Sequence, residues 1–346
     1  MSVDFGRATI VLRSRGGATS VRLDRRSVVV VAALIVVLLG VTAATLAIGT
    51  SQLTLLEVWN ALFGQTDSRT RMIVLEWRLP RLLFAILCGV ALAISGAIFQ
   101  SITRNPLGSP DVIGFDAGAY TGALFVMLVV GSGSYSAIAG GSLIGGLGTA
   151  AIVYLLAYRR GVEGFRLIIV GIGVGALLSS VNTYLLLIVD VNKAIVASAW
   201  GAGSLNALGF EQLVPFAVLL ALLLPAVAAV APGLSQAELG DDAARALGSH
   251  VERNRLLGTI IAVALTALVT AAAGPISFIA LVAPQIAQRL TGSAGLGLVT
   301  SAAVGATLLA AADFAAQRIA LPVGLVTVSV GGVYLIWLLT REYRKS

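Results

Sequence analysis

Long stretches without a charged residue alternate with short polar segments along most of the chain. A helix needs about 20 mainly apolar residues to cross the hydrocarbon core of a bilayer. Most of the stretches reach that length, and they indicate membrane helices because a helix satisfies its backbone hydrogen bonds internally. The stretches are Ser27–Leu56, Leu82–Thr103, Ala117–Tyr158, Leu167–Val189, Gln212–Ala237, Leu256–Gln288, Leu290–Ala312 and Ile319–Thr340.

Two of these stretches are too long for a single helix. Ala117–Tyr158 contains the turn-forming segment Gly131-Ser-Gly-Ser134, and Leu256–Gln288 contains Gly274-Pro275. Dividing both stretches predicts about ten crossings and an all-α, polytopic membrane protein. The shorter apolar run Ala194–Phe210 predicts a re-entrant or interfacial piece rather than a crossing.

The basic residues set the orientation of the helices. With ten crossings and a cytoplasmic N-terminus, 17 of the 23 Lys and Arg residues fall on the cytoplasmic side and 6 fall outside. This split follows the positive-inside rule and places both termini in the cytoplasm. The chain then divides into a basic N-terminal tail (1–26), a transmembrane domain (27–340) and a short C-terminus (341–346).

Composition supports the same class of protein. Hydrophobic residues make up 58% of the 346 residues and charged residues 11%, with a mean hydropathy of +0.97. Soluble domains carry about 25% charged residues, so a soluble enzyme, a disordered chain and a nucleic-acid-binding domain are excluded. The net charge of +7 arises in the loops. One histidine, His250, and one cysteine, Cys88, also exclude a zinc site within the chain.

The chain lacks an energy source of its own. A P-loop requires Gly-Lys before Ser or Thr, and neither of the two lysines follows a glycine. We therefore expect a pore subunit that is driven by a separate ATPase and is not an enzyme. An ion-coupled carrier is the alternative of another class, with Asp313, Asp111 and Asp116 as its acidic residues. A membrane enzyme is disfavoured because Asp241-Asp242 has no second aspartate-rich segment to hold magnesium.

The segment 232–256 is the longest polar insertion between the late apolar runs. It predicts a short cytoplasmic helix over Glu238–Leu247 with Gly248 as its C-cap, followed by a second short helix over Ser249–Leu256. Small residues in the first helix leave room for a partner surface to approach. A docking element for the ATPase is therefore favoured over a solvated loop.

Polar motifs flank the second apolar run at both ends. Arg78-Leu-Pro-Arg81 lies at the outer edge, where Pro80 suits the first turn of a helix. Its arginines could offer forked donors to carboxylates of an external partner, or could extend to lipid headgroups. At the inner end, Gln100 and Asn105 are candidates for the mouth of a transport pathway.

Taken together, these motifs resemble the FecCD family of iron-siderophore permeases, which are subunits of vitamin B12-type ABC importers. The resemblance runs from about Ser27 to the C-terminus. The motifs that carry it are Arg78-Leu-Pro-Arg81, Ser95-Gly-Ala-Ile-Phe-Gln100, Arg104-Asn-Pro-Leu-Gly-Ser-Pro110, Gly240–Gly248, Gly274-Pro-Ile-Ser-Phe278, Leu281-Val-Ala-Pro284, Ala312-Asp313 and Leu321-Pro-Val-Gly324.

The family implies partners that the residues alone do not reveal. It implies a permease of about ten helices in the bacterial cytoplasmic membrane, forming half of a translocation pathway with a second FecCD-type permease subunit. It also implies two copies of an ABC ATPase, which hold ATP and Mg, and an external siderophore-binding protein. The implied cargo is a ferric siderophore of the catecholate, enterobactin-like kind. Haem and cobalamin are the alternative cargoes, because related permeases share one scaffold.

The resemblance also assigns roles to individual residues. It makes Arg78, Arg81 and Arg318 docking residues for the external binding protein. The residues that it assigns to ATPase coupling are Glu238, Gly240, Asp242, Ala243, Ala244, Leu247 and Gly248. No cofactor or metal site is expected in this chain. Two positions depart from the family pattern, since Gln285 stands where the family usually has His and Arg318 lies about one position away from the usual arginine.

Overall fold

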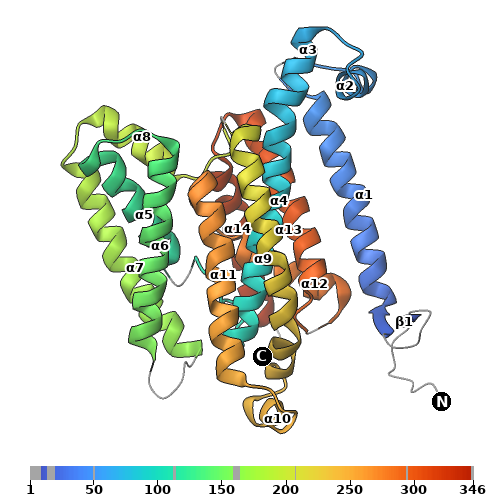
Figure 1. Ribbon diagram of the computed structural model, residues 1–346, viewed down its shortest axis with the longest axis vertical. Helices are drawn as coiled ribbons and strands as arrows, with labels where there is room; N and C mark the ends of the chain where they lie inside the picture. The colour runs from blue at the N-terminus through green and yellow to red at the C-terminus, as the bar shows by residue number, and fades with distance from the viewer. Residues whose placement is uncertain are drawn as a thin grey trace.

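The computed structural model describes residues 9–13, 20–49, 51–111, 114–158, 164–206, 208–293 and 295–343. Within these residues the chain is helical apart from one two-stranded hairpin, which confirms the all-α prediction (Figure 1). Each predicted apolar run contains one helix after the two long runs are divided. These helices are α1 (Arg25–Ala47), α4 (Leu79–Thr103), α5 (Phe115–Leu124), α6 (Tyr135–Ala157), α7 (Gly164–Leu187), α9 (Phe210–Ala237), α11 (Val251–Ala273), α12 (Ile279–Thr291), α13 (Leu298–Ile319) and α14 (Val323–Tyr343).

Shorter elements connect these helices. The helices α2 and α3 lie between α1 and α4, α8 follows α7, and α10 follows α9. Two π-helical segments, η1 and η2, continue α3 into α4 and extend α5. Their bounds are α2 (Leu55–Leu62), α3 (Ser68–Met72), η1 (Ile73–Arg78), η2 (Phe125–Val130), α8 (Val191–Gly201) and α10 (Asp241–Ala246).

The predicted count of about ten crossings is not exact. In the described part of the chain, seven helical segments have the length and hydropathy to cross a membrane. The apolar helices Phe115–Val130 and Val323–Trp337 are shorter. Helix α12 has 13 residues, which span about 20 Å at 1.5 Å per residue, less than the ~30 Å hydrocarbon core.

The helices form two groups that lie side by side (Figure 1). The side bundle contains α5, η2, α6, α7 and α8, and the main bundle contains α1, α4, α9 and α11–α14. Helix α11 of the main bundle packs against α6 and α5 of the side bundle. Inside the side bundle, Gly122 of α5 approaches the backbone of Gly141 on α6 so closely that a Cβ would collide with it.

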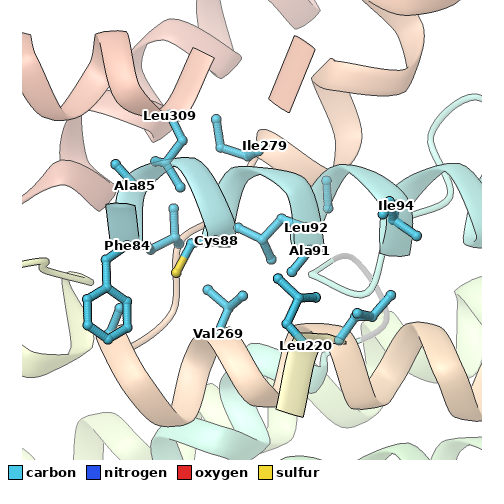
Figure 2. Close-up of a cluster of buried hydrophobic side chains, with 14 of the residues drawn as sticks. Phe84, Ala85, Cys88, Ala91, Leu92, Ile94, Leu220, Val269, Ile279 and Leu309 are labelled. Carbon is cyan, nitrogen blue, oxygen red and sulfur yellow. The ribbon is translucent and has the colours of Figure 1, made fainter. Parts of the chain in front are cut away.

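Helix α4 lies at the centre of the main bundle and is buried along most of its length. Figure 2 shows its side chains, including Phe84, Cys88 and Leu92, meeting residues from α9, α11, α12 and α13. Gly89 packs on the backbone of Gly305 in α13, and Gly96 packs on the backbone of Ala280 in α12. Such glycine contacts let membrane helices approach closely, because packing and not water drives their association.

The basic tail contains a hairpin that the sequence analysis did not predict. Strands β1 (Thr9–Arg13) and β2 (Ser20–Asp24) pair antiparallel, with Thr9 opposite Asp24. Asp24 then caps α1, since its carboxylate accepts a hydrogen bond of 3.3 Å from the Ser27 amide. The rest of the predicted tail (1–8 and 14–19), Arg159 and Arg160, and the C-terminal residues 344–346 lie outside the described residues.

The polar segment between α9 and α11 is shorter than predicted. Helix α9 continues to Ala237 and so includes Pro232, and the separate helix is limited to α10, Asp241–Ala246. The predicted second short helix over Ser249–Leu256 is wrong, because α11 begins at Val251 and continues without a break. The connecting segment is therefore 238–250, which we call the coupling loop.

The predicted re-entrant piece over Ala194–Phe210 contains the end of α8. This helix has 11 residues, too few to cross a membrane, and it covers one end of the side bundle (Figure 1). Trp200 of α8 stacks on Tyr120 of α5, with ring centroids 6.2 Å apart.

Candidate functional site

The three arginines predicted to dock an external protein lie together at the end of the bundle opposite α10. Arg78, Arg81 and Arg318 line one cavity of about 620 Å³ with residues from η1, α13 and the segment that follows α1. We call these three side chains the outer arginine cluster. Arg78 and Arg81 lie more than 200 residues before Arg318 in the sequence. Among the described residues, Asp313 is the acidic side chain that forms an ion pair with this cluster. Two positive charges are therefore left without an acidic partner among the described residues.

Arg78 is the most buried member of the cluster, with 8% of its surface exposed. Its Nη1 donates to the Leu46 carbonyl (2.5 Å) and its Nη2 donates to the Ser51 carbonyl (2.6 Å). The guanidinium also lies over Gly49, where a Cβ would collide with it. Arg78 therefore fixes the turn that follows α1, and its docking role stays a prediction.

Arg81 forms a forked ion pair with the buried carboxylate of Asp313. Its Nη2 lies 2.8 Å from Oδ1 and its Nε lies 3.0 Å from Oδ2. The third nitrogen of Arg81, Nη1, donates to the Asn206 side chain, and Gln317 donates to Asp313 Oδ2 at 2.7 Å. Arg318 is exposed, donates to the Ile48 carbonyl (2.6 Å) and stacks on Phe314. It is the member most accessible to a partner.

At the opposite end of the bundle, Asp241 holds the coupling loop to the rest of the chain. Its carboxylate pairs with Arg104 at the end of α4 and with Arg255 in α11, the latter at 2.8 Å. Partial burial would raise the pKa of Asp241, but Arg255, Arg104 and Arg245 together lower it below the ordinary value. Arg104 also donates to the Ala237 carbonyl at 2.7 Å. The sequence analysis did not single out this ion-pair cluster.

The residues predicted to couple to an ATPase divide into exposed and buried positions. Ala244 is fully buried against the chain, so it cannot itself contact a partner. Burial of Glu238 raises the pKa of its carboxyl group. Gly240 and Gly248 have φ values of +109° and +81°. The C-cap of α10 is Leu247, so Gly248, the predicted C-cap, lies one residue beyond it. The exposed predicted residues are Asp242, Ala243, Leu247 and Gly248.

Two large apolar side chains stand out on this otherwise polar loop. Leu247 is 60% exposed and Leu239, which the sequence analysis missed, is 68% exposed. Leu239 lies close to Glu238 and Asp241 in a polar segment. A leucine in such a position is a sequence feature that could have identified it as exposed. Two exposed leucines on a polar loop favour contact with another protein.

The two predicted pathway residues, Gln100 and Asn105, line one cavity of about 290 Å³ beside the coupling loop. Gln100 is buried, and its amide nitrogen donates to the Leu281 carbonyl at 2.9 Å. Gln285 donates to Gln100 Oε1 at 3.2 Å and to the Pro106 carbonyl at 3.1 Å. Gln285 therefore links α12 to the end of α4. The pathway role of Gln100 and Asn105 stays a prediction.

The fold is that of a polytopic helical membrane protein, with the outer arginine cluster at one end and two exposed leucines on the coupling loop at the other. The profile of the FecCD transport family matches residues 33–341, and the chain belongs to this family. It is therefore a multi-pass membrane permease and not an enzyme.

Individual relatives agree with this assignment. The chain is 52% identical over 294 residues to the ferric enterobactin transport system permease protein FepG of Escherichia coli K12, covering 84% of this chain and 89% of that protein. It is 35% identical over 321 residues to the siderophore transport system permease protein YfhA of Bacillus subtilis, covering 88% of this chain and 93% of that protein. A solved inward-facing structure of a metal-chelate type ABC transporter superposes with a TM-score of 0.78 at 25% identity, covering 91% of this chain and 99% of the solved chain.

Proposed function

We propose that this chain is the permease subunit of an ATP-driven importer that carries a ferric siderophore of the catecholate, enterobactin-like kind. The observation that carries the proposal is the 52% identity to FepG, a ferric enterobactin permease, over most of both chains. Other relatives, named for siderophores or ferric citrate, are 30–35% identical. With a second FecCD-type permease, this subunit forms the translocation pathway.

The coupling loop is the docking element for an ABC ATPase, of which the importer holds two copies. Leu239 and Leu247 offer apolar contacts, while Asp241 holds α10 against α4 and α11. A force on α10 therefore reaches α4 through the ion pair with Arg104. ATP and Mg are bound by the ATPase and not by this chain, which has no P-loop lysine.

The outer arginine cluster is the docking site for the external siderophore-binding protein. Its unbalanced positive charge favours carboxylates on the partner surface, and charge complementarity raises the rate and specificity of docking. Arg318 is exposed, while Arg78 and Arg81 are held within the chain. The importer lies in the bacterial cytoplasmic membrane with the coupling loop and both termini in the cytoplasm, the orientation that satisfies the positive-inside rule.

Deleting this subunit in the bacterium that carries it tests the proposal. Uptake of radiolabelled iron bound to enterobactin should be lost and should return when the chain is expressed from a plasmid. Uptake of cobalamin and haem should be unchanged. Loss of cobalamin or haem uptake with normal uptake of ferric enterobactin would assign the permease to one of those cargoes instead.

A second measurement separates an ATP-driven permease from an ion-coupled carrier. The subunit purified from its own membrane should carry a second permease and an ATPase with it. Transport by the reconstituted complex should stop when the ATPase is inactivated. Transport that continues without ATP in response to an ion gradient would refute the ATP-driven mechanism.

A further inference from the structure

Two acidic residues, Asp111 and Asp116, lie at the junction between the side bundle and the main bundle. Asp111 precedes α5, and Asp116 is in its first turn. Both face the segment before α12, because Asp111 Oδ2 accepts a hydrogen bond of 2.9 Å from the Phe278 amide and Ser277 Oγ lies 3.4 Å from Asp116 Oδ2. The permease function proposed above assigns no role to either carboxylate.

This junction lies at membrane depth. Helix α12 has 13 residues and ends on the side of the coupling loop, so Phe278 at its start is about 20 Å from that end. The hydrocarbon core is about 30 Å thick. Helix α5 begins at the same junction and is also too short for a full crossing on its own. The two carboxylates therefore lie where two short helices begin inside the membrane.

Each carboxylate has one buried oxygen that lacks a hydrogen-bond partner, Oδ1 in both residues. The two carboxylates contact the adjacent residues Ser277 and Phe278, so their charges lie near one another. Across the described residues, neither forms an ion pair with a basic side chain. The titratable groups on the elements packed around this site include Tyr120 on α5, Tyr135 and Tyr154 on α6, Arg166 and Tyr184 on α7, Glu252, Arg253 and Arg255 on α11, Arg289 on α12 and Tyr334 on α14.

Of these groups, Tyr135 has a hydroxyl that is already used, because it donates to the Ala272 carbonyl at 3.3 Å. The arginines of α7, α11 and α12, including Arg166, lie near the ends of their helices on the side of the coupling loop. A counterion for Asp111 and Asp116 is therefore missing. Burying one unpaired charge in an apolar medium is very unfavourable, and two carboxylates that share one site cannot both stay ionised.

We propose that Asp111 and Asp116 form an intramembrane proton-binding site in which Asp116 holds the proton and Asp111 stays ionised. Asp111 accepts the Phe278 amide at the start of α12, where the helix dipole stabilises negative charge. Asp116 accepts the longer hydrogen bond, 3.4 Å from Ser277 Oγ. A proton on Asp116 removes one of the two charges and supplies a hydroxyl donor at a site where Asp111 Oδ1 has no hydrogen-bond partner.

The bound proton stabilises the contact between the two bundles. Asp116 belongs to the side bundle through α5, whereas Ser277 and Phe278 lead into α12 of the main bundle. Loss of the proton puts two like charges at this contact and favours separation of the bundles. The proton-binding site does not depend on which cargo the permease carries, so its test is independent of the test of siderophore specificity.

Infrared spectroscopy of the purified full-length permease in its complex tests for the proton directly. A protonated carboxylic acid gives a carbonyl stretching band that is separate from carboxylate bands and shifts in heavy water. The wild type should show this band at neutral pH, Asp116→Asn should lose it, and the exposed control Asp190→Asn should keep it. Absence of the band from the wild type, or its survival in Asp116→Asn, would overturn the proposal.

The pH dependence of thermal unfolding gives a second readout. A proton that is bound more tightly in the folded state stabilises that state at low pH, and the stabilisation is lost as the pH rises. The unfolding temperature of the wild type should therefore fall in alkaline buffer, and Asp116→Asn should remove most of this fall. An equal fall in both proteins would count against the site. Stability that depends on sodium or potassium, without a carboxylic acid band, would assign the site to a metal cation instead.

Discussion

Removing one partner of the ion pair between Arg81 and Asp313 should destabilise the outer half of the bundle, because it leaves a buried charge without a partner. Asp313 is 1% exposed and accepts from Arg81 through both of its oxygens. In Arg81→Ala, only the amide of Gln317 remains for this carboxylate. Breaking a buried ion pair by removing one partner costs about 3–5 kcal/mol. We expect the lower part of this range, because the Arg81 side chain is 18% exposed.

Equilibrium unfolding in mixed micelles measures this loss. Arg71→Ala is the matched control, since Arg71 lies on the same side of the bundle and is exposed. The double variant Arg81→Ala/Asp313→Ala should lose less than the sum of the two single variants, because it leaves no uncompensated charge. If Arg81→Ala unfolds like Arg71→Ala while its affinity for the external binding protein falls, Arg81 is a docking residue and the structural reasoning is refuted.

Three further outcomes are expected in the coupling loop. Leu247→Glu should reduce co-purification of the ATPase without changing the unfolding of this chain, because its side chain is 60% exposed; equal recovery of the ATPase would show that Leu247 is not part of the contact. Gly248→Val should destabilise the loop by about 1–3 kcal/mol, since φ at this position is +81°, and proteolysis of the loop would report it; Gly332→Val, in open space within a helix, is the control. Asp241 has a lowered pKa, so its ion pairs should hold α10 at neutral pH and lose their contribution as the pH falls through that lowered value. The protection factors of the α10 amides, which allow for the intrinsic slowing of exchange in acid, should then fall in acid for the wild type and be low at every pH for Asp241→Ala.

Charge-free runs predict where the helices lie, but they misplace one end of α13, because a buried ion pair allows a charged residue inside this helix. The apolar run was ended at Ala312 because Asp313 follows it, yet α13 continues to Ile319. Asp313 is tolerated inside the helix because Arg81 neutralises it. That partner lies 232 residues away in sequence, so no local pattern could reveal it. The same run was begun at Leu290, whereas α12 extends to Thr291 and α13 starts at Leu298.

In the candidate sites, too, local sequence motifs identify some residues, whereas contacts between residues distant in sequence cannot be predicted from them. The Arg78-Leu-Pro-Arg81 motif identified two of the three arginines in the outer cluster, and its proline does occupy the first turn of α4. The partners of Arg78 are the carbonyls of Leu46 and Ser51, and any residue type could supply a carbonyl. Likewise, Ala244 and Ala243 look alike in sequence, and only the packing of α10 shows that one is buried and the other exposed.

Helix α4 connects the two ends of the molecule that the proposed function uses. It carries Arg81 at one end, and Arg104 follows its last residue at the other. The first is tied to α13 through Asp313 and the second to the coupling loop through Asp241. Between these ends, glycine contacts bring α4 against the backbones of α13 and α12, leaving no space for either to slide independently. Close-packed interiors transmit displacement instead of absorbing it, so a movement of the coupling loop that shifts α4 must carry α12 and α13 with it.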